Sequence, residues 1–261
     1  MNGSRVILLG LAVLLSLKTP EPLQASDWPT IQARGYLRVG VKDNLRPLAF
    51  RDAQGNWQGL EIDLARRLAQ ELLGSEQALQ LLPLLNSERL PALLADRVDV
   101  VIAQLGINTA RARLVDFSPY YYLDGISIVT KKNSGLNSFT VNGLKLGVLQ
   151  YSAAIAVLRY KFPQATLIPF GSYQEAYESL NQGKIQAFAG DLSVLTGWVQ
   201  EHRDFGQWPL LGSESALGIA LPRGLQYDSL RQKVNWVIVN LRASGWLRQR
   251  GAHWGLFPFT P

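Results

Sequence analysis

Apolar stretches with the character of β-strands alternate along the chain with segments of helical period, and this alternation constrains the fold more than any other feature. The strand-like stretches are 36–41, 78–82, 98–103, 126–130, 146–149, 165–170, 185–189 and 217–221. Between the first two, residues 60–73 place Leu64, Leu68 and Leu72 four residues apart, as on the buried face of a helix. The alternation predicts an α/β fold with largely parallel sheets.

Serine residues indicate where two further helices begin. Ser87 can cap a helix that runs to Ala95, and Ser172 can cap a helix over residues 173–181. Gly183 lies just beyond the second helix and suits a left-handed C-cap. Both helices are expected to pack against neighbouring strands, as in other α/β units.

Two stretches 87 residues apart share one pattern. Leu93, Asp96, Arg97, Val98 and Val100 correspond to Leu180, Gly183, Lys184, Ile185 and Ala187. In both, a helix ends in a tight turn with a basic residue and continues directly into a buried strand. Any two strand–helix units can share such a pattern, but here it suggests two similarly built lobes.

The expected organisation has two lobes and two crossings of the chain. Residues 30–121 together with 219–261 form the first lobe, and residues 126–215 form the second. The hinge strands lie near 122–128 and 216–221. In such architectures a ligand binds where the strand ends of the two lobes face each other.

The N-terminus has the order of a secretory signal. Arg5 precedes the apolar run 6–17, and a proline-containing stretch then leads to the small residues Ala25 and Ser26. The run is shorter than the roughly 20 residues that span a bilayer. We therefore predict that residues 1–25 are a signal peptide and that the mature protein is periplasmic. The alternative is a retained N-terminal anchor.

Composition excludes several classes of function. The chain has no cysteine and only His202 and His253, so a lipidated cysteine, a metal site, a Cys nucleophile and a Ser-His-Asp triad are not expected. Lys and Arg exceed Asp and Glu by 26 to 20, but they are scattered singly, which argues against nucleic acid. No segment resembles a phosphate-cradling Walker loop. We expect no cofactor.

The loop after the predicted strand 98–103 is suited to an anion. It begins at Gln104 and leads to Asn108, which can open a helix with free backbone N–H groups. Arg111 lies in the first turn of that helix and adds a two-pronged donor for a carboxylate. Alternatively, Arg111 pairs with Asp116 or faces solvent.

A carboxylate follows the corresponding strand of the second lobe. The stretch 185–189 ends at Gly190 and Asp191. Asp191 can receive a cation, or it can cap the helix that begins at Leu192, and the pattern favours neither. An anion site on one lobe and a carboxylate on the other suit a zwitterion held across a cleft.

Several ordered motifs resemble those of a known family. They are Gly35-Tyr-Leu-Arg-Val-Gly-Val with Pro47 and Phe50, Gly59-Leu-Glu-Ile-Asp-Leu-Ala65, Arg111 through Val115-Asp-Phe-Ser118 with Pro119-Tyr-Tyr121, and Gly245-Trp246 with Trp254-Gly255. Over residues 33–257 the chain is similar to the bacterial family 3 solute-binding proteins, the receptors of polar amino-acid ABC importers. The resemblance implies a two-lobed periplasmic binding protein type II fold, in which each lobe is a mostly parallel sheet flanked by helices.

The resemblance also implies a function and partners. The expected protein is a non-enzymatic, monomeric receptor that captures a free amino acid and delivers it to a membrane permease with its ATPase subunit. Arg111 corresponds to the arginine that clamps the α-carboxylate, Asp191 to the α-amine aspartate, and Ser152 to a hydroxyl that holds the carboxylate with neighbouring amides. The full predicted ligand-binding set is Arg111, Asp191, Ser152, Gly106, Gln104, Asp43, Ala153 and Leu45.

The chain departs from the family pattern near the proposed site. Gly106 stands where a carboxylate-binding Thr is usual, Lys42 (followed by Asp43) stands at an acidic position, and Leu45 and Asn86 stand where aromatic side chains often stack on the ligand. Tyrosines at 120–122 and 151 are either alternative aromatic surface or ordinary hinge packing.

Two other classes of function share this fold. One is a ligand-presenting module that serves a membrane sensor, which the sequence does not separate from a transport receptor. The other is a dehydratase-type enzyme, which needs an acid or base over the ligand. Glu61 and Asp63 are the carboxyl groups nearest to such a role, but we expect both on the surface of their helix.

Overall fold

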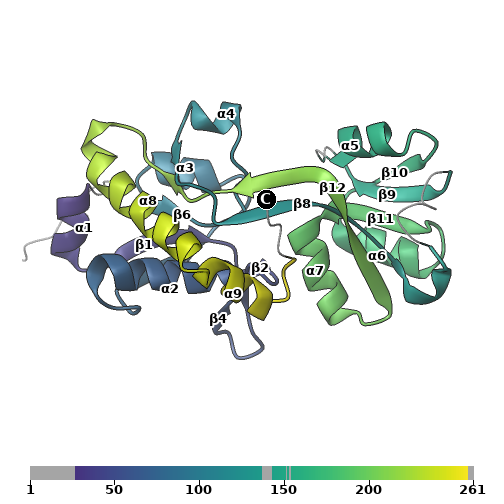
Figure 1. Cartoon of the computed structure of the whole chain (residues 1–261), viewed down its shortest axis with the longest axis horizontal. Coiled ribbons are helices and arrows are strands. Elements are labelled where there is room, and N and C mark those ends of the chain that lie inside the picture. Colours follow the sequence, from purple (N-terminus) through teal and green to yellow (C-terminus); the bar gives the residue numbers. More distant parts are fainter. Residues whose placement is uncertain (1–26, 137–142, 151, 153, 258–261) are drawn as a thin grey trace, which may run out of the picture.

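Two five-stranded sheets form two lobes, and the chain crosses between them twice (Figure 1). The computed structural model describes residues 27–136, 143–150, 152 and 154–257. The predicted signal peptide and Ala153 lie outside these residues. Among the described helices, none combines the length and the apolar character that a membrane crossing requires.

The first sheet has the order β5-β1-β6-β13-β7. Its strands are β5 (Leu79–Pro83), β1 (Leu37–Val41), β6 (Val100–Val101), β13 (Ala220–Leu221) and β7 (Asp116–Phe117). β1 pairs in parallel with β5 and β6, whereas β13 runs antiparallel to both of its neighbours. Four strands therefore share one direction, as a mostly parallel sheet requires.

The two-residue period of a strand divides this lobe into two cores. Val39, Val100 and Ile102 belong to one core, and Val101 and Ala103 belong to the other. The helices of the first core are α1 (Trp28–Arg34), α2 (Leu60–Leu73), α8 (Asp228–Ala243) and α9 (Trp246–His253). The second core is covered by α3 (Arg89–Leu94). The C-terminal helices thus complete the lobe that the N-terminal half begins.

A small antiparallel sheet projects from the first lobe. It consists of β2 (Asn44–Leu45), β3 (Ala49–Arg51) and β4 (Trp57–Gln58). The turn between β2 and β3 contains Arg46 and a cis peptide bond to Pro47. This turn lies on the side of the first lobe that faces α7 (Leu192–Glu201) of the second (Figure 1).

The second sheet has the order β10-β9-β11-β8-β12. Its strands are β10 (Thr166–Phe170), β9 (Lys145–Leu149), β11 (Ala187–Asp191), β8 (Tyr122–Lys131) and β12 (Phe205–Leu217). Here β8 is the strand that runs opposite to the others. Ala187 and Ala189 pack towards α5 (Ala154–Lys161), while Phe188 packs towards α6 (Tyr173–Asn181) and α7.

The long strands β8 and β12 carry both crossings. They pair antiparallel from Phe205 with Lys131 to Leu217 with Tyr122, and their register shifts between Leu210 and Ser215. The expected crossing stretch 216–221 is divided, because its first two residues end β12 and its last two form β13 in the first sheet. The remaining short elements are α4 (Thr109–Ala112), η1 (Lys132–Ser134) and η2 (Leu225–Tyr227).

Local signals in the sequence placed some helices and misplaced one. α2 spans the predicted residues, and Ser172 caps α6 by accepting a hydrogen bond from the Glu175 N–H at 3.1 Å. The predicted Ser87 cap is wrong, because α3 begins at Arg89 with Glu88 at its N-cap position. Residues before it form a turn in which the Glu88 carboxylate accepts from the Leu85 N–H at 2.9 Å.

The repeated pattern corresponds to the same turn in both lobes. Asp96 and Gly183 adopt left-handed φ angles of 62° and 70°. The next residue bonds back into the helix in both cases, from Arg97 N to Ala92 O and from Lys184 N to Ser179 O, each at 2.9 Å. The two lobes therefore share this helix-to-strand turn.

Candidate functional site

A cavity of about 500 Å³ lies between the lobes. From the first lobe it is lined by Lys42, Asn44, Leu45, Arg46, Asn86 and Gln104. From the second lobe it is lined by Leu149, by side chains of α6, and by one face of α7 from Asp191 to His202. Its lining thus joins the ends of strands from both sheets.

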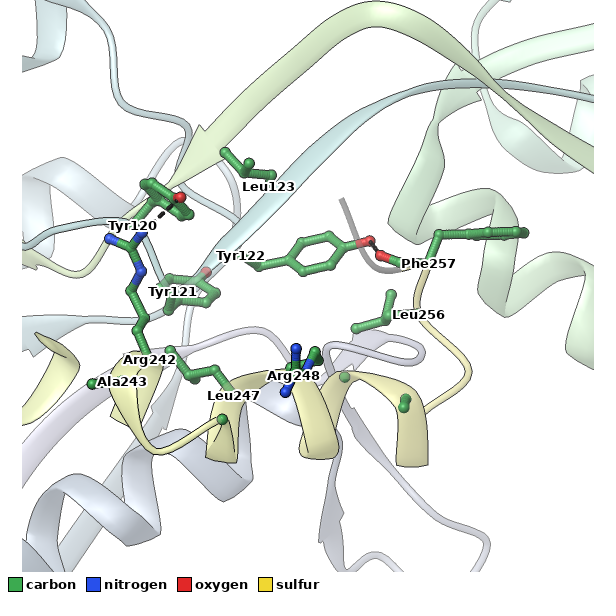
Figure 2. Close-up of a pocket in the computed structure, with 13 residues that line it drawn as sticks. Tyr120, Tyr121, Tyr122, Leu123, Arg242, Ala243, Leu247, Arg248, Leu256 and Phe257 are labelled. Carbon is green, nitrogen blue, oxygen red and sulfur yellow. Dashed lines mark hydrogen bonds between the residues drawn. The ribbon is translucent and has the colours of Figure 1, made fainter. Parts of the chain in front are cut away.

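A second cavity, of about 320 Å³, lies on the first lobe between the start of β8 and the helices α8 and α9 (Figure 2). Arg242 donates to the Tyr120 hydroxyl at 2.7 Å, and the Tyr122 hydroxyl donates to the Phe257 carbonyl at 3.3 Å. None of the described residues that line this cavity is acidic. It therefore lacks a counter-charge for an ammonium group, and the cavity between the lobes is the better candidate for a zwitterion.

Gln104 connects the two lobes at the inner end of the cavity between them. Its backbone has a left-handed φ of 47°, which is uncommon for a residue other than glycine. Its backbone N–H donates to Glu61 Oε1 at 2.6 Å. Its side-chain amide lies 3.4 Å from Asp191 Oδ2 and 3.3 Å from Ser193 Oγ. Glu61 of α2 therefore holds the turn that follows β6, and the Gln104 side-chain amide in this turn points towards the second lobe.

Asp191 occupies the N-cap position of α7, but its side chain makes no capping hydrogen bond. Enclosure between the lobes and the nearby charge of Asp124 raise the pKa of the Asp191 carboxyl to about 6. No cationic side chain among the described residues forms an ion pair with it. The Asp191 side chain therefore does not cap α7, and its carboxylate lines the cavity.

Asp124 is fully buried beside Asp191. It accepts hydrogen bonds from the Ser193 N–H at 2.9 Å, the Ser193 hydroxyl at 2.6 Å and the Gly125 N–H at 2.9 Å. Burial nevertheless raises the pKa of Asp124. Asp124 is buried and Asp191 is exposed to the cavity, so two neighbouring carboxyl groups make this end of the cavity electronegative.

Glu61 and Asp63 are not on the helix surface, and that expectation is wrong for both. Glu61 is fully buried, where Oε1 accepts from the Tyr121 hydroxyl at 2.5 Å and Oε2 has no partner in the described structure. Burial raises the pKa of Glu61 from its ordinary 4.5 to about 7. Asp63 instead binds Arg250 and the Trp254 indole N–H, which anchors α9 on α2. The first turn of α2 passes beneath other elements, which a helical period does not show.

Two arginines lie beside the turn after β6. Arg111 follows the Asn108 cap of α4, and its Nη1 donates to the Gly106 carbonyl at 2.7 Å. Arg89 donates from Nη1 to the carbonyls of Ala103 and Gln104 at 2.8 and 3.0 Å. Burial, together with the charge of Arg111, lowers the pKa of Arg89. Neither guanidinium pairs with a carboxylate in the described part of the chain.

The alternative partner of Arg111 is engaged elsewhere, since Asp116 lies 4.0 Å from Arg231. Lys42 adds a third cation, because its buried amine donates to the Leu84 carbonyl at 3.1 Å and lines the cavity. Burial and the charge of Arg89 lower the pKa of Lys42. The first lobe therefore presents an electropositive surface towards the carboxyl groups of the second.

The structure brings together only part of the predicted site. Gln104, Asp191 and Leu45 line the cavity. Arg111 and Gly106 contact each other beside the hinge, where Gly106 forms a bridge with Leu217, and neither lines the cavity. Three predicted residues remain. The Ser152 hydroxyl accepts a hydrogen bond from the Ala154 N–H at 3.1 Å, and the Asp43 carbonyl accepts one from the Arg51 N–H. Ala153 lies outside the described residues.

The sequence does not predict several residues in or near the cavity. Arg89, which holds the turn after β6, carries no sequence signal beyond its place in a predicted helix. The aromatic wall comes from the second lobe, where Tyr177 stacks on His202 with ring centroids 4.4 Å apart, and Tyr173 and Trp198 line the same side. Both pairs, 173 with 177 and 198 with 202, have helical i, i+4 spacing. That spacing is the sequence signal that could have located this wall. The second-lobe aromatic side chains stand in for those that Leu45 and Asn86 lack.

Comparison with solved structures places the fold in a class. The chain matches an ancestral cationic amino acid solute-binding protein with a TM-score of 0.74 at 26% identity, covering 87% of this chain and 98% of the other. Two lobes, two crossing strands and a cavity between them define a periplasmic binding protein of type II. The predicted fold class is confirmed.

Comparison of sequences identifies the family. The model of the bacterial extracellular solute-binding proteins, family 3, matches residues 37–257, and the chain belongs to this family. A glutamine-binding protein of Geobacillus stearothermophilus is 31% identical, over 67% of this chain and 68% of its own. A glutamine-binding protein of an ABC transporter from Bacillus subtilis is 27% identical, over 79% and 76%. The predicted family and the general role of solute receptor are confirmed.

Proposed function

We propose that this protein is a periplasmic, monomeric receptor that binds a free α-amino acid between its lobes and delivers it to an ABC permease. The observation that carries the proposal is the separation of charge across the cavity. Asp191 lines the cavity from the second lobe and has Asp124 beside it, while Lys42 lines it from the first lobe. Arg89 and Arg111 lie beside the turn after β6 in the first lobe, without lining the cavity. An α-ammonium and an α-carboxylate match this pattern, and charged hydrogen bonds to both are strong.

Closure follows from the same arrangement. A solute that contacts both lobes stabilises the conformation in which they meet, whereas a solute that contacts one lobe does not. Arg111 of α4 donates to the carbonyl of Gly106, and Gly106 is bridged to Leu217 at the hinge end of β12. Small movements at the hinge therefore allow the Arg111 guanidinium to donate hydrogen bonds to a bound carboxylate. A membrane sensor is the alternative recipient of the closed form.

The described lining favours a polar, uncharged side chain on the solute. Four amides line the cavity, from Asn44, Asn86, Gln104 and Gln174. Besides Asp191, the one carboxylate in this lining is Glu201, and it is paired with Arg46 at 3.2 Å. A cationic side chain would therefore lack a free counter-charge, and the glutamine-binding relatives support the same choice.

We expect glutamine to stabilise residues 26–261 more than arginine or glutamate in a thermal-shift screen of the twenty amino acids. A ligand present at 1,000 times its Kd adds about 4 kcal/mol to the free energy of unfolding. The panel includes prephenate and arogenate, assayed for turnover as well as binding. Consumption of either would contradict the non-enzymatic proposal, and an absence of any amino-acid shift would contradict the receptor proposal.

Replacing Arg111 with alanine is expected to weaken binding of every amino acid about 10-fold or more, because the α-carboxylate is common to all of them. Isothermal titration calorimetry measures the change. Arg113→Ala is the matched control, since that exposed side chain lies two residues further along. Equal affinities for the two variants would remove Arg111 from the site.

A further inference from the structure

Gly197 lies in the interior of α7, where glycine needs a specific reason. Its backbone is helical, without the positive φ that favours glycine. Glycine inside a helix costs roughly 0.5–1 kcal/mol relative to alanine. The residue is buried, and the surface that covers it belongs to the other lobe. Glycine is therefore needed at this position for the contact between the lobes and not for the local backbone conformation.

The contact is made by the backbone of the β2–β3 turn. A Cβ atom added to Gly197 would lie 2.2 Å from the Arg46 carbonyl oxygen and 2.7 Å from its carbon. Those atoms belong to the main chain, so no change of rotamer relieves the overlap. Alanine at this position therefore requires the β2–β3 turn, and with it the first lobe, to move away from α7.

Side chains around this contact hold the turn in position. The Arg46 guanidinium lies over the Phe50 ring at 3.9 Å, and its Nε lies 3.2 Å from Glu201, one turn further along α7. A second interlobe contact lies nearby, where the Gln200 amide donates to the Trp254 carbonyl at 2.7 Å. Both side chains of the Arg46–Glu201 pair are substantially exposed, so we expect this ion pair to add little free energy.

We propose that Gly197 is the closing seat of the receptor, the point on α7 where the two lobes meet. The Arg46 carbonyl packs against the backbone of α7 only because residue 197 lacks a side chain, and this approach lets one solute touch both lobes. The proposal rests on the proposed function for its solute. It makes Gly197 a positioning residue, which acts on affinity through the closed conformation and touches no solute atom. Its effect appears as a loss of closed population.

The test compares Gly197→Ala with Gly251→Ala. Gly251 lies inside α9, and a Cβ there meets only the Leu256 Cβ at 4.0 Å, an ordinary contact. Both changes add one methyl group to a helix. Calorimetry with glutamine is expected to show at least 30-fold weaker binding for Gly197→Ala and unchanged binding for Gly251→Ala, with neither variant losing thermal stability without solute. Wild-type affinity in Gly197→Ala would overturn the proposal.

A second measurement reads closure without relying on the solute. Because the chain has no cysteine, Gln54→Cys and Arg203→Cys place two spin labels on opposite lobes at exposed positions. We expect pulsed electron paramagnetic resonance to show loss of the short distance in Gly197→Ala and its retention in Gly251→Ala. The same distances in all three proteins would also overturn the proposal. If no amino acid binds wild type but Gly197→Ala still lengthens the distance, the receptor proposal fails while the closing seat stands.

Discussion

Asp191→Asn is expected to weaken amino-acid binding by about 100-fold or more, the largest effect of any single change in the cavity. The solute ammonium neutralises a carboxylate that has no cationic partner among the described residues and whose pKa is raised to about 6 by enclosure and by Asp124. Asparagine keeps the size of the side chain but removes its charge. Calorimetry with glutamine measures the loss.

A solute without an amine separates this role from a structural one. Glutarate carries two carboxylates but no ammonium, so Asp191→Asn should bind it no more weakly than wild type does. Asp204→Asn, at an exposed position of the same lobe, is the control for charge alone. If Asp191→Asn weakened glutamine and glutarate equally, Asp191 would be a structural residue.

Glu61→Gln is expected to reduce the pH dependence of the free energy of unfolding in the solute-free protein. Burial raises the pKa of Glu61 from 4.5 to about 7, so between these values the folded protein binds more protons than the unfolded chain. Its free energy of unfolding therefore falls as pH rises through this range, by about 3 kcal/mol for a carboxyl with this shift. The glutamine side chain at position 61 has the shape of the protonated acid and does not titrate.

Urea unfolding at pH 5 and pH 8 measures this difference in both proteins. The wild type should lose stability between pH 5 and pH 8. Glu61→Gln should lose the part of that slope due to Glu61 and retain the part due to Asp124 and Asp191, whose raised pKa values act in the same direction. Arg89, Lys42 and Tyr121 also face Glu61 and remain in both proteins. Identical slopes would show that Glu61 is already ionised at pH 5.

The fold was predictable where the deciding interactions are local. The apolar period of residues 60–73 defines α2, and the Ser172 hydroxyl needs only the third residue after it to act as a cap. The repeated turn at Asp96 and Gly183 likewise depends on a few neighbouring residues. The Ser87 cap failed because a turn closed by Glu88 competes for the same residues.

The site was less predictable because long-range contacts build it. Glu61 looks like an exposed first-turn acid until Tyr121 and the backbone of Gln104 cover it. Arg89 reaches the turn after β6 only through the packing of α3 on the sheet. The pattern places Asp191 at the end of a strand. Whether its side chain caps α7 depends on the assembled cavity, where it makes no capping hydrogen bond.

The pairing of Tyr122 with Leu217 has a consequence for the order of folding. The chain leaves the first lobe and returns to it at neighbouring residues, so everything between them is an insertion within the first lobe. Joining the halves of that lobe across an unfolded insertion of this length costs about 4 kcal/mol of loop-closure entropy. Folding of the insertion brings β8 and β12 together and removes that cost. We therefore expect variants that unfold the second lobe also to destabilise the first.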